Sequence, residues 1–88
     1  MREFRHTLKD KNGLHARPAG LLATAARSFE SEIKVECGGK EADGKRLLSL
    51  MSLGARCGAE LLFKISGADE EAAEKSLKEH CASKLDGE

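Results

Sequence analysis

The chain has 88 residues, which is the length of one small domain and too short to enclose a deep substrate cavity. Its 15 basic and 15 acidic residues cancel, and its aromatic residues are three phenylalanines. This composition favours neither a basic surface that binds nucleic acid nor an aromatic surface on which bases stack. The sequence contains no apolar run of membrane-spanning length. We therefore expect one domain over residues 1–88, with no nucleic-acid partner and no membrane insertion.

The three cysteines, Cys37, Cys57 and Cys81, are odd in number and lack the paired spacing of a metal site. The first residues are charged and include no apolar signal segment. Reduced thiols are the rule in a reducing compartment. We expect a cytoplasmic protein with free cysteines, no metal site and no cofactor.

The first half of the chain predicts a strand followed by a helix. Residues Arg2–Leu8 alternate between apolar and polar side chains, as in a half-buried strand, and Asp10–Gly13 forms a polar loop. Apolar residues at helical spacing then predict a helix from Ala16 to about Arg27, with Pro18 in its first turn. The apolar face of this helix consists of Ala19, Leu22, Ala23 and Ala26.

The second half predicts strands over Glu32–Cys37 and Lys40–Ala42, a short helix over Leu47–Leu53, a strand over Glu60–Ser66 and a helix beginning at Asp69. Gly38-Gly39 predicts a hairpin between the first two of these strands. Four strands and three helices in the order βαββαβα indicate an α+β domain of two layers, with helices on one face of a sheet. Periodicity alone leaves the order of the strands in the sheet open.

The segment Gly13–Gly20, GLHARPAG, places His15 at the start of the first helix, beside the free N–H groups of Ala16 and Arg17. A helix N-terminus attracts anions and disfavours a protonated imidazole, so it favours a neutral, nucleophilic ring. Arg17 adds a forked cation suited to phosphate oxygens, and Pro18 has no N–H to offer. This arrangement predicts that His15 accepts and donates a phosphoryl group. For a lone histidine before a helix, a surface or capping role is the common alternative.

The same segment, taken with Met51–Ala55, Gly58–Glu60 and Gly67–Glu71, resembles the HPr family over nearly the whole chain. Members of this family are histidine phosphocarriers of the bacterial phosphoenolpyruvate-dependent sugar phosphotransferase system. The resemblance implies an open-faced β-sandwich, in which three helices cover one face of a four-stranded antiparallel sheet of order 1-4-2-3. It also implies that enzyme I phosphorylates Nδ1 of His15 and that sugar-specific enzyme IIA domains receive the group. We expect a monomeric transfer component that is not an independent enzyme.

The short helix is apolar around most of its circumference. We expect Leu47, Leu50 and Leu53 to face the core in part, and Leu48 and Met51 to be at least partly exposed. The pattern alone equally allows a fully buried helix. The resemblance favours a docking surface for the partner proteins, made of Ala16, Arg17, Gly20, Leu21, Thr24, Arg27, Leu47, Leu48 and Met51.

One position departs from the family pattern. In many Gram-positive members a serine opens the short helix and is phosphorylated by a regulatory kinase, whereas Arg46 stands at that position here. Arginine cannot accept the phosphate, so we do not expect this regulation. The alternative function is a regulatory, phosphorylation-dependent binding module on the same scaffold, for example in a nitrogen-related branch, which is not committed to sugar uptake.

Overall fold

The computed structural model describes residues 1–85. The elements are β1 (Arg2–Thr7), α1 (Ala16–Ala26), β2 (Glu32–Cys37), β3 (Lys40–Asp43), α2 (Leu47–Met51), β4 (Glu60–Ser66) and α3 (Glu70–His80), followed by a π-helical turn over Cys81–Leu85. This confirms the predicted order βαββαβα. The prediction that the short helix extends to Leu53 was wrong. Beyond Met51 the backbone makes i→i−3 bonds, from Leu53 to Leu50 and from Gly54 to Met51, which form a tighter terminal turn.

The four strands form one antiparallel sheet in the order β1-β4-β2-β3, as the family resemblance implied. The central strand β4 pairs with β1 on one side and β2 on the other, so that Phe63 lies opposite both Phe4 and Val35. Leu61, Phe63 and Ile65 of β4 alternate with more exposed residues and are fully buried. The sheet therefore has one apolar face, which the helices must cover.

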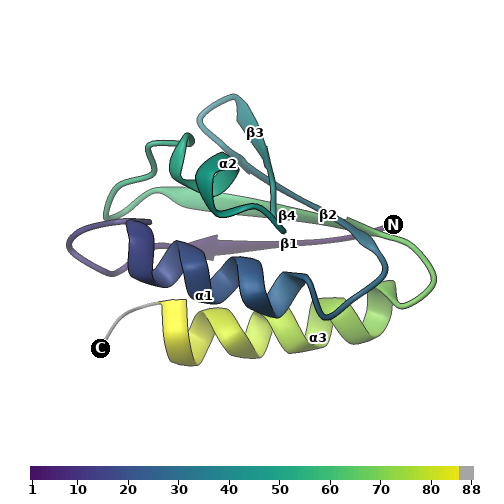
Figure 1. The fold of residues 1–88 in the computed structure, drawn as a ribbon. Coiled ribbons are helices and arrows are strands. Elements are labelled where there is room, and N and C mark those ends of the chain that lie inside the picture. The colour runs from purple at the N-terminus through teal and green to yellow at the C-terminus, as the bar shows by residue number, and fades with distance from the viewer. Residues whose placement is uncertain (86–88) are drawn as a thin grey trace.

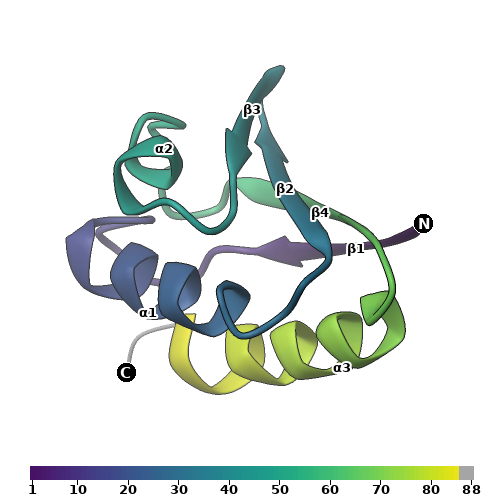
Figure 2. The same ribbon diagram turned by 45° about the vertical axis from the view of Figure 1, so that its right-hand side comes forward.

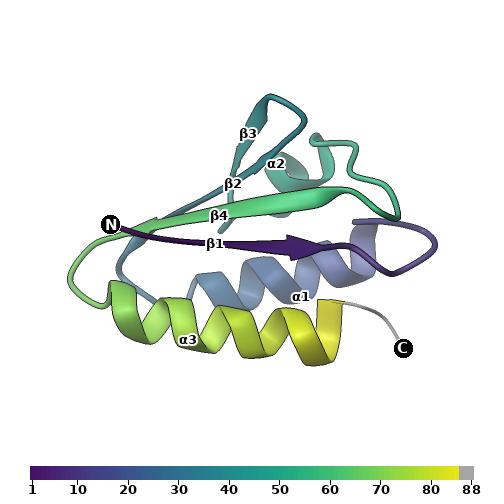
Figure 3. The same ribbon diagram turned by 180° about the vertical axis from the view of Figure 1, so that it is seen from behind.

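Helices α1 and α3 lie side by side and run antiparallel across this apolar face (Figures 1 and 3). The short helix α2 packs against α1 and β3 (Figure 2). The predicted apolar face of α1 is buried, as are the inner residues of α3 and of the turn after it, and together with the inner residues of the strands they form the core. These helix residues are Ala19, Leu22, Ala23 and Ala26 of α1, Ala73 and Leu77 of α3, and Cys81.

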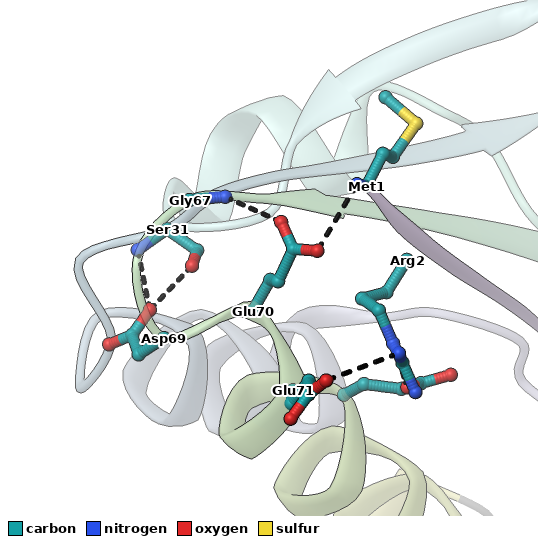
Figure 4. A network of polar contacts seen from close by, with 8 residues as sticks. Met1, Arg2, Ser31, Gly67, Asp69, Glu70 and Glu71 are labelled. Carbon is teal, nitrogen blue, oxygen red and sulfur yellow. Dashed lines mark hydrogen bonds and ion pairs between the residues drawn. The ribbon is translucent and has the colours of Figure 1, made fainter.

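Acidic side chains at the start of α3 form hydrogen bonds and an ion pair with residues that flank the strands (Figure 4). One oxygen of the Asp69 carboxylate accepts hydrogen bonds from the backbone N–H and the hydroxyl of Ser31, and the other accepts from the N–H of Glu30. Glu70 accepts from the N–H of Gly67 at 3.0 Å and pairs with the N-terminal ammonium group of Met1 at 3.1 Å. The bonds from Ser31 and Glu30 lower the pKa of Asp69 against the opposing effect of desolvation. This carboxylate therefore links α3 to the segment that leads into β2.

The substitution Asp69→Asn should lower the thermal midpoint by several degrees at pH 7, because an amide accepts weaker hydrogen bonds than a carboxylate. The pKa of Asp69 is lower in the folded protein, so its stabilising effect is complete above about pH 4 and is lost as the pH falls through the lowered pKa. The difference from the wild type in thermal melts should therefore shrink as the pH falls below about 4. Glu79→Gln, on the exposed side of α3, is the control. A difference independent of pH would contradict the assignment.

Candidate functional site

His15 lies at the start of α1, as the sequence predicted. It is the N-cap residue, and its carbonyl oxygen accepts the N–H of Ala19 at 3.0 Å. Its side chain makes no capping bond to the helix and is 36% exposed. Ala16 and Arg17 are the first two helical residues, and Pro18 is buried in the third position. Within residues 1–85 the structure describes no hydrogen bond for the N–H groups of Ala16 and Arg17, so the helix end presents two free donors.

The loop that leads to His15 is held by close backbone contact with the loop after α2. Gly13 has a φ of +68°, and a Cβ at this position would lie 2.3 Å from the carbonyl oxygen of Ala55. The next N–H, of Leu14, donates to that same oxygen at 3.0 Å. Only glycine permits both this backbone conformation and this approach. The contact fixes where the chain enters α1, and with it the position of His15.

Asp10 also contacts His15 and completes the loop. One carboxylate oxygen, Oδ1, accepts the N–H of Asn12 at 2.8 Å, and the other, Oδ2, lies 3.3 Å from Nε2 of His15. The pKa of Asp10 is lowered first by the N–H of Asn12 and further by His15 and Arg17, while desolvation opposes the shift. The carboxylate is consequently ionised at neutral pH.

Sequence reasoning missed the role of Asp10 and treated Asp10–Gly13 only as a polar loop. An aspartate two positions before Asn-Gly is typical of a turn in which the carboxylate accepts a backbone N–H. That signal was available in the sequence. It does not predict, however, that the second carboxylate oxygen reaches the imidazole.

Arg17 is exposed, and the structure describes no hydrogen bond or ion pair for its guanidinium group within residues 1–85. It nevertheless lies near enough to Asp10 to lower the pKa of that carboxyl group. A cation close to the His15 loop and without a fixed partner can turn towards an incoming anion at little cost. Arg17 and the two free N–H groups are thus the donors that this end of α1 offers.

Eight of the nine residues expected to form a docking surface lie on α1 or α2, and Arg27 is the C-cap of α1. The short helix α2 lies beside α1 (Figure 2). Gly20 is half-buried and the other eight are exposed. Leu48 is 79% exposed, Leu21 and Met51 are each 39% exposed, and Leu47 is 37% exposed. Leu50 and Leu53 are buried, so α2 divides its leucines between the core and the solvent. Apart from Met1, all exposed large apolar residues in the described part of the chain lie on this surface.

Polar contacts set the position of α2 relative to α1. The guanidinium group of Arg27 donates to the carbonyl oxygen of Lys45 at 2.8 Å, and Nζ of Lys45 donates to the carbonyl oxygen of Phe29 at 2.7 Å. The hydroxyl of Ser49 accepts the N–H of Asp43 at 2.9 Å. Arg27 thus has a structural contact in addition to its predicted place in the docking surface. Arg46 is the exposed N-cap of α2, at the start of the short helix.

No group of three or more histidine, cysteine, aspartate or glutamate side chains in residues 1–85 is placed to hold a metal ion. None of the described helices has the length and apolar character needed to cross a bilayer. The candidate site comprises His15, Arg17, the N–H groups of Ala16 and Arg17, and the neighbouring apolar surface.

Comparisons with known proteins show the family to which this chain is similar. A family model described as "PTS HPr component phosphorylation site" matches residues 2–83. The "Phosphocarrier protein HPr" of Mycoplasma genitalium is 44% identical over 79 residues, which is 89% of this chain and 90% of the relative.

Two solved structures share the fold over nearly their full length. A histidine-containing phosphocarrier protein of Mycoplasma superimposes with a TM-score of 0.92 at 30% identity, covering 96% of both chains. HPr-C-His from Thermoanaerobacter tengcongensis superimposes with a TM-score of 0.91 at 40% identity, covering 100% of this chain and 99% of the other. Fold and sequence thus agree over almost all of the chain.

Proposed function

This chain belongs to the HPr family of phosphocarriers of the phosphotransferase system, and on that premise we propose that it carries a phosphoryl group on His15 from enzyme I to sugar-specific enzyme IIA domains. One observation carries the proposal: a partly exposed imidazole stands at a helix N-terminus with two unpaired N–H donors. A histidine that served only as a cap or a surface residue would not need this combination with Arg17.

The proposed chemistry follows from these groups. The neutral imidazole of His15 attacks phosphorus through a ring nitrogen, which the family resemblance identifies as Nδ1. The N–H groups of Ala16 and Arg17 can donate to the phosphoryl oxygens, and the guanidinium group of Arg17 stabilises the charge on the transferring group. The site is open and has few donors, so it holds the phosphoryl group weakly enough to release it.

The test is incubation of the protein with enzyme I and phosphoenolpyruvate labelled in its phosphoryl group. We expect acid-labile label on the peptide that contains His15, and transfer of that label to a sugar-specific IIA domain. Label that loads but moves to no IIA domain would favour the alternative of a regulatory binding module. Absence of label with an enzyme I that phosphorylates a control HPr would reject both functions.

We further propose that the exposed residues of α1 and α2 dock both partners, because an apolar patch next to the reacting histidine is suited to brief contacts. The substitution Leu48→Asp should raise the KM for loading by enzyme I by about 30-fold and change kcat little, since it places a charge in the proposed apolar docking surface. The folded state should be unaffected, because Leu48 is 79% exposed.

The matched control is Ala72→Asp, which adds the same charge to an exposed position on α3, away from the patch. Its KM should equal that of the wild type. Equal KM values for Leu48→Asp and the wild type would remove Leu48 from the docking surface.

The candidate site and the docking surface come from one chain, so we propose that the protein acts as a monomer. Membership of the family supports a cytoplasmic location.

A further inference from the structure

The two ring nitrogens of His15 have different surroundings. Nε2 lies 3.3 Å from Oδ2 of Asp10, whereas the structure describes no hydrogen bond for Nδ1 within residues 1–85. A neutral imidazole carries its proton on one nitrogen and a lone pair on the other, and only the lone pair can attack phosphorus. The group that fixes the proton therefore decides which nitrogen is the nucleophile.

Asp10 is held firmly enough to fix that proton. Its Oδ1 accepts the N–H of Asn12 and its carbonyl oxygen accepts the N–H of Gly13, each at 2.8 Å. Its side chain is 10% exposed, so Oδ2 has limited access to water and faces the imidazole. An ionised carboxylate can only accept hydrogen bonds, so Nε2 must be the nitrogen that carries the proton.

We propose that Asp10 is a positioning residue that orients the His15 ring and holds it in the form protonated on Nε2, leaving the lone pair of Nδ1 open for phosphoryl transfer. The inference deepens the proposed function and rests on it, because the tautomer matters only if His15 is the nucleophile. The contact with Asp10 gives a structural reason why Nδ1, and not Nε2, would be the nucleophile.

The same contact serves transfer in both directions. During loading, the lone pair of Nδ1 forms the bond to phosphorus, the bond between phosphorus and the donor breaks, and its electron pair stays with the donor. The proton remains on Nε2, so the ring becomes cationic beside the Asp10 carboxylate, which stabilises it. During discharge a nucleophile of the accepting IIA domain forms a bond to phosphorus, the N–P bond breaks, and its electron pair returns to Nδ1. Because Nε2 is still protonated, the ring leaves as neutral imidazole and not as a much poorer imidazolate leaving group.

The tautomer can be measured without any partner protein, by long-range 1H–15N NMR of the protein labelled in its histidines, at a pH where the ring is neutral. We expect the wild type to show the Nε2–H form as the dominant signal of His15. In Asp10→Asn the amide oxygen can still accept the N–H of Asn12, but an amide N–H then faces Nε2. The population should therefore shift towards the Nδ1–H form.

Asp43→Asn is the matched control, because Asp43 accepts the N–H of Lys45 at 2.9 Å in the same i→i+2 arrangement and does not contact His15. Its tautomer and its loading rate should equal those of the wild type. In Asp10→Asn we expect loading by enzyme I to slow by about 10- to 100-fold. Losses of this size follow in metal sites when a carboxylate that hydrogen-bonds and orients a histidine ligand is removed.

Two kinds of outcome would overturn the inference, and they are distinguishable. If the wild type shows the Nδ1–H form, or if Asp10→Asn matches Asp43→Asn in tautomer or in loading rate, the role of Asp10 is rejected while the phosphocarrier function stands. If the wild type does not load at all with a competent enzyme I, the proposed function fails, and the role of Asp10 in transfer fails with it.

Discussion

The substitution His15→Ala should abolish acid-labile labelling by enzyme I and phosphoenolpyruvate, while the protein remains folded. Loss of loading should be complete, because no other group at the start of α1 can form the bond to phosphorus. The fold should survive because the side chain makes no capping bond and is 36% exposed. Radiolabel incorporation and a thermal melt of the same preparation measure the two effects.

The chain supplies its own controls for this experiment, since it contains three histidines. His6→Gln on β1 and His80→Gln on α3 should load at the wild-type rate. Label on the His15→Ala protein at a comparable rate would show that a different residue accepts the phosphoryl group. The proposed site would then be wrong even though the family assignment would stand.

The substitution Arg17→Ala should slow both loading and discharge by about 10²–10³-fold, which is the effect of removing one donor that stabilises the charge of a transition state. Arg17 is exposed, so its loss should leave the thermal midpoint nearly unchanged. Arg17→Lys should recover part of the rate, because lysine keeps the charge but loses the forked geometry. Rapid-quench measurement of label gained from enzyme I and label passed to a IIA domain gives the two rates.

Arg5→Ala is the matched control for Arg17→Ala. Arg5 is an exposed arginine on the edge strand β1, where it pairs with Glu60 at 3.2 Å. Its removal changes the net charge of the protein by the same amount, without touching the start of α1. If Arg17→Ala and Arg5→Ala showed equal rates, the effect of Arg17 would be one of general charge, and its direct role in the transfer would be excluded.

The order of the helices and strands, and the place of His15 at the start of a helix, could be predicted from the amino-acid sequence, whereas the end of the short helix could not. Period-two and helical spacing identify strands and helices because each must bury one face, so residues such as Phe63 in β4 and Leu22 in α1 could be assigned to the core. Pro18 and the apolar residues after it marked the start of α1, which placed His15 at the N-cap. These are local properties, and neighbouring residues suffice to predict them.

Contacts between residues of different elements and loops are known only from the folded structure. The sheet order β1-β4-β2-β3 followed from family resemblance and not from periodicity, because alternation shows which face of a strand is buried but not which strand lies beside it. The contact of Gly13 with Ala55 joins loops that are far apart in the sequence. Asp10 is only five residues before His15, yet its reach to Nε2 depends on a turn that this contact holds in place, so no local pattern could predict it.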